Sequence, residues 1–258
     1  MLIFPFLGYF RNIYLNLPPE YLTDMKKPHF LTPLVIVAAA ASPLMSSAEN
    51  IAVSTPATTL LLDATKGEPL HFIYYGNALR PDETAAVASS KKNRLDAYPV
   101  YGLTSLKETA MSVKHPDGNM TLDMRVSDVV KSTDDDGSQT TTIIMKDTHY
   151  PFEVKANYKT YSDADIIETW VEACNTGKGD VVLNEFSSAY LPVHQGNVYL
   201  SSFYGSWANE AKLEEEPLKH GLKVIKNKDG ARNSHTAHAE VMLSLDGKPA
   251  EDHGRVIG

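Results

Sequence analysis

Two histidines near the carboxyl-terminal end have a spacing that could support metal chemistry. His235 and His238 are three positions apart, and imidazoles at this spacing can share a metal ion when they lie on one face of a helix. The surrounding residues follow no helical pattern, and the sequence indicates no carboxylate partner. A pair of solvated loop histidines is therefore the favoured interpretation, and we predict no metal site.

Two runs of acidic residues could bind a cation by their composition alone. The run Asp134-Asp135-Asp136-Gly137 is similar to part of a calcium loop, but its acids are consecutive instead of alternating, and no glutamate closes the loop. The same residue types are typical of a hairpin turn, which is the favoured interpretation. Glu214-Glu215-Glu216 is a charge run of the kind that faces solvent.

The residues alone indicate no active site. Hydrolysis of a glycosidic bond needs two carboxyl groups on opposite sides of that bond, and the sequence brings no two acids together. No G-x-S-x-G elbow, phosphate-binding glycine loop or catalytic-cysteine context is present. The segments His71–Gly76 and Phe203–Trp207 are rich in aromatic residues that could stack on a sugar, although core packing is the favoured explanation.

Composition limits the classes of protein that remain. The chain has 258 residues, a formal net charge of −8, 43% hydrophobic residues and 22% charged residues, as expected of a folded acidic protein. The negative balance argues against nucleic acid as the main partner. A single cysteine, Cys174, excludes an internal disulfide and a zinc cluster built on cysteines.

The elements that must position any site are predicted to be strands. Apolar and polar residues alternate in Thr121–Ser127, Glu153–Tyr161 and Glu240–Leu245, which is typical of strands with one buried face. Glycine and aspartate turns separate such segments, and Thr176–Asp180 is predicted to join Ile166–Cys174 to Val181–Phe186 as an antiparallel hairpin.

We expect about ten strands in a sandwich of two packed antiparallel sheets. Two segments do not fit the strand pattern. We predict a long loop over Asn77–Asp96, and we predict a helix over Ala208–Glu216, which ends at Pro217.

The first residues are predicted to be removed by cleavage and not to belong to the folded domain. In residues 25–48, Lys26 and Lys27 precede a short apolar stretch, and small residues stand before a predicted cut after Ala48. This pattern favours a secretory signal peptide over an uncleaved tether or a buried helix. We therefore take Met25 as the true start, 1–48 as an extension with the signal, and 49–258 as the domain. The predicted location is the bacterial periplasm or the exterior, without a membrane anchor.

Six ordered segments resemble a known family. They are similar to the amino-terminal domain of the glycoside hydrolase family 36 α-galactosidases, and most similar to exported Bacteroides-type members. The segments are Leu60–Gly76, Ala97–Gly102, Asp165–Asn175, Tyr199–Glu210, Gly221–Arg232 and Glu251–Gly258.

The resemblance implies a large all-β supersandwich of the galactose mutarotase-like type, with mostly antiparallel strands. A (β/α)₈ barrel follows in the family and hydrolyses terminal α-galactosyl residues with retention, without a metal or other cofactor. The barrel motifs K-W-D-x-N and S-D-x-x-D, which carry the nucleophile and the acid/base, do not occur here. We therefore expect a domain that is incomplete at its carboxyl terminus, holds no catalytic residue and hydrolyses nothing alone.

The resemblance also suggests where sugar contacts would lie. Family oligomers often bring this domain near a neighbouring barrel, so we predict a homo-oligomer whose barrel binds α-galactosides. Asp82 and Trp207 are the predicted substrate-binding residues, although a surface turn and interface packing are the favoured explanations for them. Many members carry G-D-[FY]-R after the position of Gly102, whereas this chain has Leu103–Lys107 without aspartate or arginine.

Three readings remain open from the sequence. The favoured one is the non-catalytic amino-terminal domain of an exported α-galactosidase. The first alternative is a free-standing carbohydrate-binding sandwich without hydrolysis. The second is a sandwich that only mediates contacts between subunits.

Overall fold

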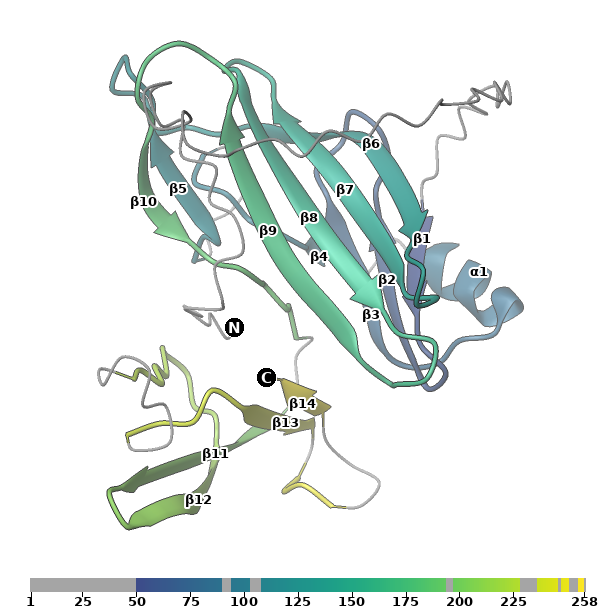
Figure 1. The fold of residues 1–258 in the computed structure, drawn as a ribbon, viewed down its shortest axis with the longest axis vertical. Helices are drawn as coiled ribbons and strands as arrows, with labels where there is room; N and C mark the ends of the chain where they lie inside the picture. Colours follow the sequence, from purple (N-terminus) through teal and green to yellow (C-terminus); the bar gives the residue numbers. More distant parts are fainter. Residues whose placement is uncertain are drawn as a thin grey trace, which may run out of the picture.

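The computed structural model describes residues 50–89, 94–102, 108–193, 197–227, 236–245, 247–250 and 255–257. Strands dominate this part of the chain, as Figure 1 shows. The elements are β1 (Asn50–Ser54), β2 (Thr58–Asp63), β3 (His71–Asn77), α1 (Pro81–Ser89), β4 (Leu95–Asp96), β5 (Met111–Lys114), β6 (Met124–Thr133), β7 (Gln139–Asp147), β8 (Phe152–Thr160), β9 (Ile167–Asn175), β10 (Val182–Phe186), β11 (Val198–Ser206), β12 (Asn209–Pro217), β13 (Val241–Leu245) and β14 (Arg255–Ile257).

Two four-stranded antiparallel sheets form the sandwich. One has the strand order β1-β2-β3-β4 and the other has the order β6-β7-β8-β9. In Figure 1 the second sheet lies in front of the first. The paired strands β10 and β5 add a smaller sheet beside them. The predicted all-β class with mostly antiparallel strands is confirmed.

The core lies between these sheets, and period-two alternation creates it. In β8, Phe152, Val154 and Ala156 are buried while the residues between them are only half-buried. They pack in one cluster with residues from the other sheets, such as Leu62 and Met111. Each such apolar side chain contributes about 1.5–3 kcal/mol when it leaves water, so this cluster is the main source of stability.

The predicted long loop over Asn77–Asp96 contains a helix, so this prediction was wrong in part. Helix α1 covers Pro81–Ser89. Proline suits the first helical position because its missing N–H would have no partner there. The Glu83 carboxylate accepts a hydrogen bond from the Arg80 N–H at 2.9 Å, which caps the first turn.

The helix predicted over Ala208–Glu216 is absent, because the described residues form strand β12 there. This strand pairs with β11 from Tyr199 opposite Pro217 to Ser206 opposite Asn209. Helix propensity is a weak preference per residue, and pairing with a long neighbouring strand overrides it. Ala208 and Ala211 adopt positive φ angles of 56° and 55°, which Ala rarely does, so the hairpin is held against local preference.

The predicted pairing of Ile166–Cys174 with Val181–Phe186 as a hairpin was also wrong. Both strands exist, but β10 pairs with β5 and not with β9. The connection through Thr176–Asp180 therefore carries the chain from the large sheet to the smaller one. Figure 1 shows this connection as a wide arc at the upper end of the molecule.

A third four-stranded sheet, β12-β11-β13-β14, lies outside the sandwich. It has its own small cluster of buried residues, Leu200, Val241 and Leu243. Several large apolar side chains on this part of the chain are exposed, including Leu213 and Leu245. None of the helices in the described residues is long and apolar enough to span a membrane.

Candidate functional site

Asp82 lies in the first turn of α1, on the surface. Its side chain is 75% exposed, and its carboxylate lies 3.5 Å from Nε of Arg80. An acidic residue in a first turn also interacts favourably with the helix dipole. This environment holds Asp82 in contact with solvent and available to a ligand or to a neighbouring subunit.

Trp207 lies at the tip of the hairpin between β11 and β12. It is 81% exposed, far more than a residue that packs in a core. Figure 1 places this hairpin and α1 on opposite sides of the molecule, so one copy of the chain does not bring Trp207 and Asp82 together. Their assignment to sugar binding stays a prediction.

The predicted absence of a metal cluster can be examined only in the described part of the chain, where no group of three or more His, Cys, Asp or Glu side chains gathers. His238 lies 3.6 Å from Glu240 and packs against the ring of Phe203. His235 lies outside the described residues, as do Leu103–Lys107 and the predicted signal segment.

The acidic run at residues 134–137 is a turn between β6 and β7, as the sequence indicates. The carbonyl of Asp134 accepts a hydrogen bond from the N–H of Gly137 at 2.9 Å, and Gly137 has a φ of 80°. Lys159 donates to the Asp134 carboxylate at 2.7 Å. A fixed ion pair and a glycine in the left-handed region are features of a structural turn.

The described carboxyl groups with shifted pKa values differ from the acid of a glycosidase in the direction of the shift. A glycosidase acid needs a raised pKa so that it carries a proton at neutral pH. In the described residues, each carboxyl with a shifted pKa has it held below the usual range, mainly by a hydrogen bond. These are Asp117 with the N–H of Asn119, Asp134 with the side chain of Lys159, and Asp136 with the hydroxyl of Ser138.

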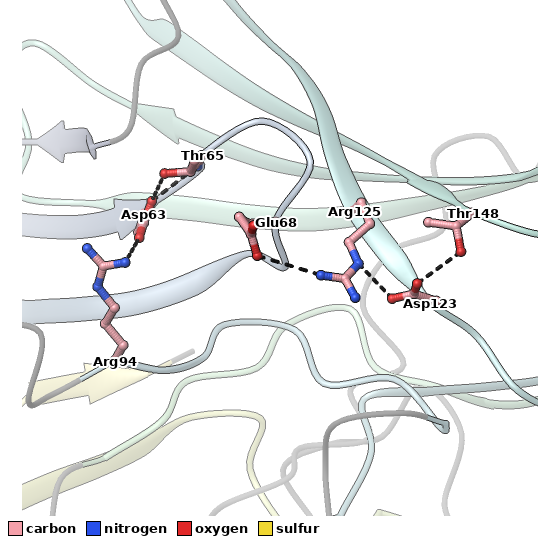
Figure 2. A network of polar contacts seen from close by, with 7 residues as sticks. All are labelled: Asp63, Thr65, Glu68, Arg94, Asp123, Arg125 and Thr148. Carbon is pink, nitrogen blue, oxygen red and sulfur yellow. Dashed lines mark hydrogen bonds and ion pairs between the residues drawn. The ribbon is translucent and has the colours of Figure 1, made fainter.

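A buried polar contact ties the end of β2 to the chain that enters β4. Asp63 is 2% exposed and pairs with the guanidinium of Arg94, as Figure 2 shows. The other Asp63 oxygen accepts hydrogen bonds from the N–H and hydroxyl of Thr65, at 3.1 and 2.6 Å. Since the ion pair with Arg94 and the two hydrogen bonds from Thr65 compensate the buried charge, we assign Asp63 a structural role.

A second group in Figure 2 joins the two large sheets. Nε of Arg125 donates to Asp123 at 2.7 Å, and its guanidinium also lies 3.7 Å from Glu68. The hydroxyl of Thr148 donates to the other Asp123 oxygen at 2.9 Å. Glu68 follows β2, whereas Arg125 belongs to β6, so the Glu68–Arg125 pair links the two large sheets, while the contacts of Asp123 orient Arg125.

A cavity of about 200 Å³ opens where three connections meet, after β5, between β7 and β8, and between β9 and β10. The sequence analysis did not identify it. Residues from each connection line it, including His115, Tyr150 and Lys178. The glycines on both sides of Lys178 are the one sequence signal for it, but they predict only a turn.

Comparison with known proteins relates this fold to one family. Residues 68–258 match the model of the Glycosyl hydrolase family 36 N-terminal domain. The bifunctional alpha-galactosidase/sucrose kinase AgaSK of Mediterraneibacter gnavus is 32% identical to this chain over 114 residues, which is 44% of this chain and 12% of that protein.

Solved structures share the fold at low identity. The GH36 alpha-galactosidase AgaA from Geobacillus stearothermophilus aligns with a TM-score of 0.67 and 18% identity, over 77% of this chain and 32% of that one. The galactosidase domain of AgaSK aligns with a TM-score of 0.68 and 22% identity, over the same shares of 77% and 32%. A variant of AgaA was solved in complex with raffinose. The present chain thus spans about a third of the solved relatives.

Proposed function

Because this chain belongs to the glycosyl hydrolase family 36 N-terminal domain family, we propose that it is the non-catalytic amino-terminal domain of an α-galactosidase, which hydrolyses terminal α-D-galactosyl residues. The observation that carries this proposal is the family match over residues 68–258, on a chain that folds as the expected sandwich. This match favours the proposal over a free-standing carbohydrate-binding sandwich.

The proposed role of the sandwich is to support a catalytic barrel contributed by further polypeptide. The two carboxyl groups that hydrolysis requires would come from that barrel. The ion pair of Glu68 with Arg125 in Figure 2 and the backbone hydrogen bonds beside it would link the two large sheets, so that loops at their edges hold a fixed position beside the barrel. A rigid support is needed because small displacements of a positioned group reduce a catalytic rate strongly.

The test separates this domain from its proposed barrel. Purified chain mixed with nitrophenyl α-galactoside should release no dye above the buffer rate. The galactosidase domain of AgaSK without its own amino-terminal sandwich serves as the barrel, and co-expression with this chain should restore turnover. Clear turnover by this chain alone, or no rescue when the AgaSK sandwich itself rescues, would contradict the proposal.

Asp82 and Trp207 are proposed to contact sugar at a neighbouring subunit's barrel in a homo-oligomer. The high exposure of both side chains supports this, since each is accessible to a second copy. In the co-expressed complex, Asp82→Ala should raise KM for raffinose, whereas Asp163→Ala, which removes another exposed aspartate, should leave it unchanged. An unchanged KM for Asp82→Ala, or a monomeric complex in light scattering, would remove this part of the proposal.

The proposal also includes export to the periplasm or the exterior of a bacterial cell. Residues 25–48 support it through the two lysines, the short apolar stretch and the small residues before the predicted cut. Expression of the whole sequence in a Gram-negative host, followed by fractionation, should yield a periplasmic protein that begins at Glu49. A cytoplasmic protein that begins at Met1 or Leu2 would contradict it.

A further inference from the structure

The cavity at the end of the sandwich is an open hollow that combines an apolar lining with exposed charged side chains. Its floor and sides are mostly apolar, with Phe152, Val181 and two prolines among the lining residues. Polar groups from different connections stand around this apolar surface. They are Asp117, Asn175, Lys178 and the phenol of Tyr150. An apolar hollow with a few converging polar groups is the usual form of a small-molecule site.

Its aromatic wall is fixed from two sides. The ring of Tyr150 stacks on the ring of His115 with centroids 3.7 Å apart and planes 7° from parallel. The Tyr150 hydroxyl donates to Asp117 at 2.7 Å and accepts from the amide of Asn119 at 2.8 Å. His115 is 3% exposed, and its buried Nε2 has no hydrogen-bond partner in the described part of the chain. The stacked rings and the two hydrogen bonds of the phenol therefore fix this wall.

Another part of the lining depends on two glycines that let the β9–β10 connection approach two prolines. A Cβ on Gly177 would overlap Cγ of Pro151, and a Cβ on Gly179 would lie 3.0 Å from Cγ of Pro116. The side chain of Asn175 braces this connection by donating to the Gly179 carbonyl at 2.8 Å. This close packing presents the residue between the two glycines at the cavity.

That residue is Lys178, which forms no ion pair with any side chain that the structure describes. In the connection after β5, the hydrogen bond from the N–H of Asn119 lowers the pKa of Asp117, so its carboxylate is ionised at neutral pH. The cavity thus offers one cation and one anion above an apolar floor. These two opposite charges cancel, so the cavity gives no net electrostatic preference for an anion or for a cation.

We propose that this cavity binds one neutral saccharide ring. A pyranose has an apolar C–H face for the floor and hydroxyl groups that can donate to Asp117 and accept from Lys178 and Asn175. The choice of a sugar over other neutral polar rings rests on the proposed function. Binding here would hold an oligosaccharide on the sandwich.

The test is a titration of the full chain with galactose and with raffinose. Binding is measured by calorimetry and by the NMR shifts of the Asn175 side-chain amide. Saturable binding is expected. Lys178→Met should weaken it by about tenfold, since a hydrogen bond from a charged donor is lost. Lys131→Met removes an equal charge from the exposed part of β6 and should have no effect. Asp117→Asn, a second variant, should also weaken binding.

Three outcomes would overturn the inference. They are no saturable binding of either sugar, equal affinity of the Lys178→Met and Lys131→Met variants, or stronger binding of acetate than of sugar. Circular dichroism of each variant confirms that it is folded. Because the assay detects binding to the isolated chain and not turnover, its failure would leave the proposed support of a barrel intact. A failed rescue of turnover would likewise leave the binding result intact.

Discussion

Replacement of Arg94 by Met should destabilise the sandwich more than replacement of its partner Asp63 by Asn. The two residues form one ion pair, but their surroundings differ. The Asp63 side chain is 2% exposed, whereas the Arg94 side chain is 33% exposed. Loss of Arg94 therefore leaves a buried charge without its partner, whereas loss of the Asp63 charge leaves a partly exposed one. This difference determines which variant loses more free energy of unfolding.

In Arg94→Met the carboxylate of Asp63 stays buried and keeps only the two hydrogen bonds from Thr65. Breaking a buried pair in this way costs about 3–5 kcal/mol, mostly because a charge is left without its partner. In Asp63→Asn the amide oxygen can still accept both Thr65 bonds, and Arg94 can turn toward water. The expected cost is about 1.5–3 kcal/mol, similar to the loss of one charged hydrogen bond.

Both costs are measured by urea unfolding of the two single variants and of the double variant, with circular dichroism as the signal. The double variant should be less destabilised than Arg94→Met alone, because the neutral amide replaces the unpaired charge. A larger loss for Asp63→Asn than for Arg94→Met would refute the reasoning. A loss below about 1 kcal/mol for Arg94→Met would also refute it, since that is the range of an exposed pair.

Three further predictions concern other parts of the chain. Gly177→Ala should destabilise the chain by about 1–3 kcal/mol in urea unfolding, because the new methyl overlaps Pro151. A hydrogen bond from Lys159 lowers the pKa of Asp134 in the folded state. The contribution of Asp134 to stability is therefore complete above the unfolded-state pKa of about 3.9, and it is lost as the pH falls through the folded-state pKa. In an NMR titration, Lys159→Met should raise this pKa, and an unchanged value would contradict the assignment. Trp207→Ala should change stability by no more than about 0.5 kcal/mol, because the side chain is 81% exposed.

The strands of the sandwich were predictable because burial on one face leaves a period-two pattern in the sequence. Leu122, Met124 and Val126 are all buried, as their alternation indicates. The same pattern is weaker in the outer sheet. Val241 and Leu243 are buried, but Leu245 is 52% exposed, since the described residues provide no layer that covers this end of the strand.

Pairing partners were not predictable from neighbouring residues. The segment Ala208–Glu216 has the composition of a helix, and only the long pairing with β11 makes it a strand. The strand β10 follows β9 after a short glycine-rich connection, yet it pairs with β5, which comes much earlier in the chain. Such contacts depend on the sum of packing over whole sheets, which a short window of sequence does not contain.

The cavity was missed for the same reason, because it is made where connections from distant parts of the chain converge. His115, Tyr150 and Lys178 belong to three separate turns, and none of these turns has a motif of its own. The stack of His115 on Tyr150 exists only because β5 and the β7–β8 turn end at the same edge of the sandwich. Gly177 is explained by this convergence, because an added Cβ would overlap Pro151. Gly179 is favoured for two reasons, since its φ of 96° suits glycine and an added Cβ would lie 3.0 Å from Pro116. The close approach that presents Lys178 to the cavity is therefore a property of the assembled fold. Gly177→Ala adds a methyl group at this point of contact, so it should weaken saccharide binding together with stability.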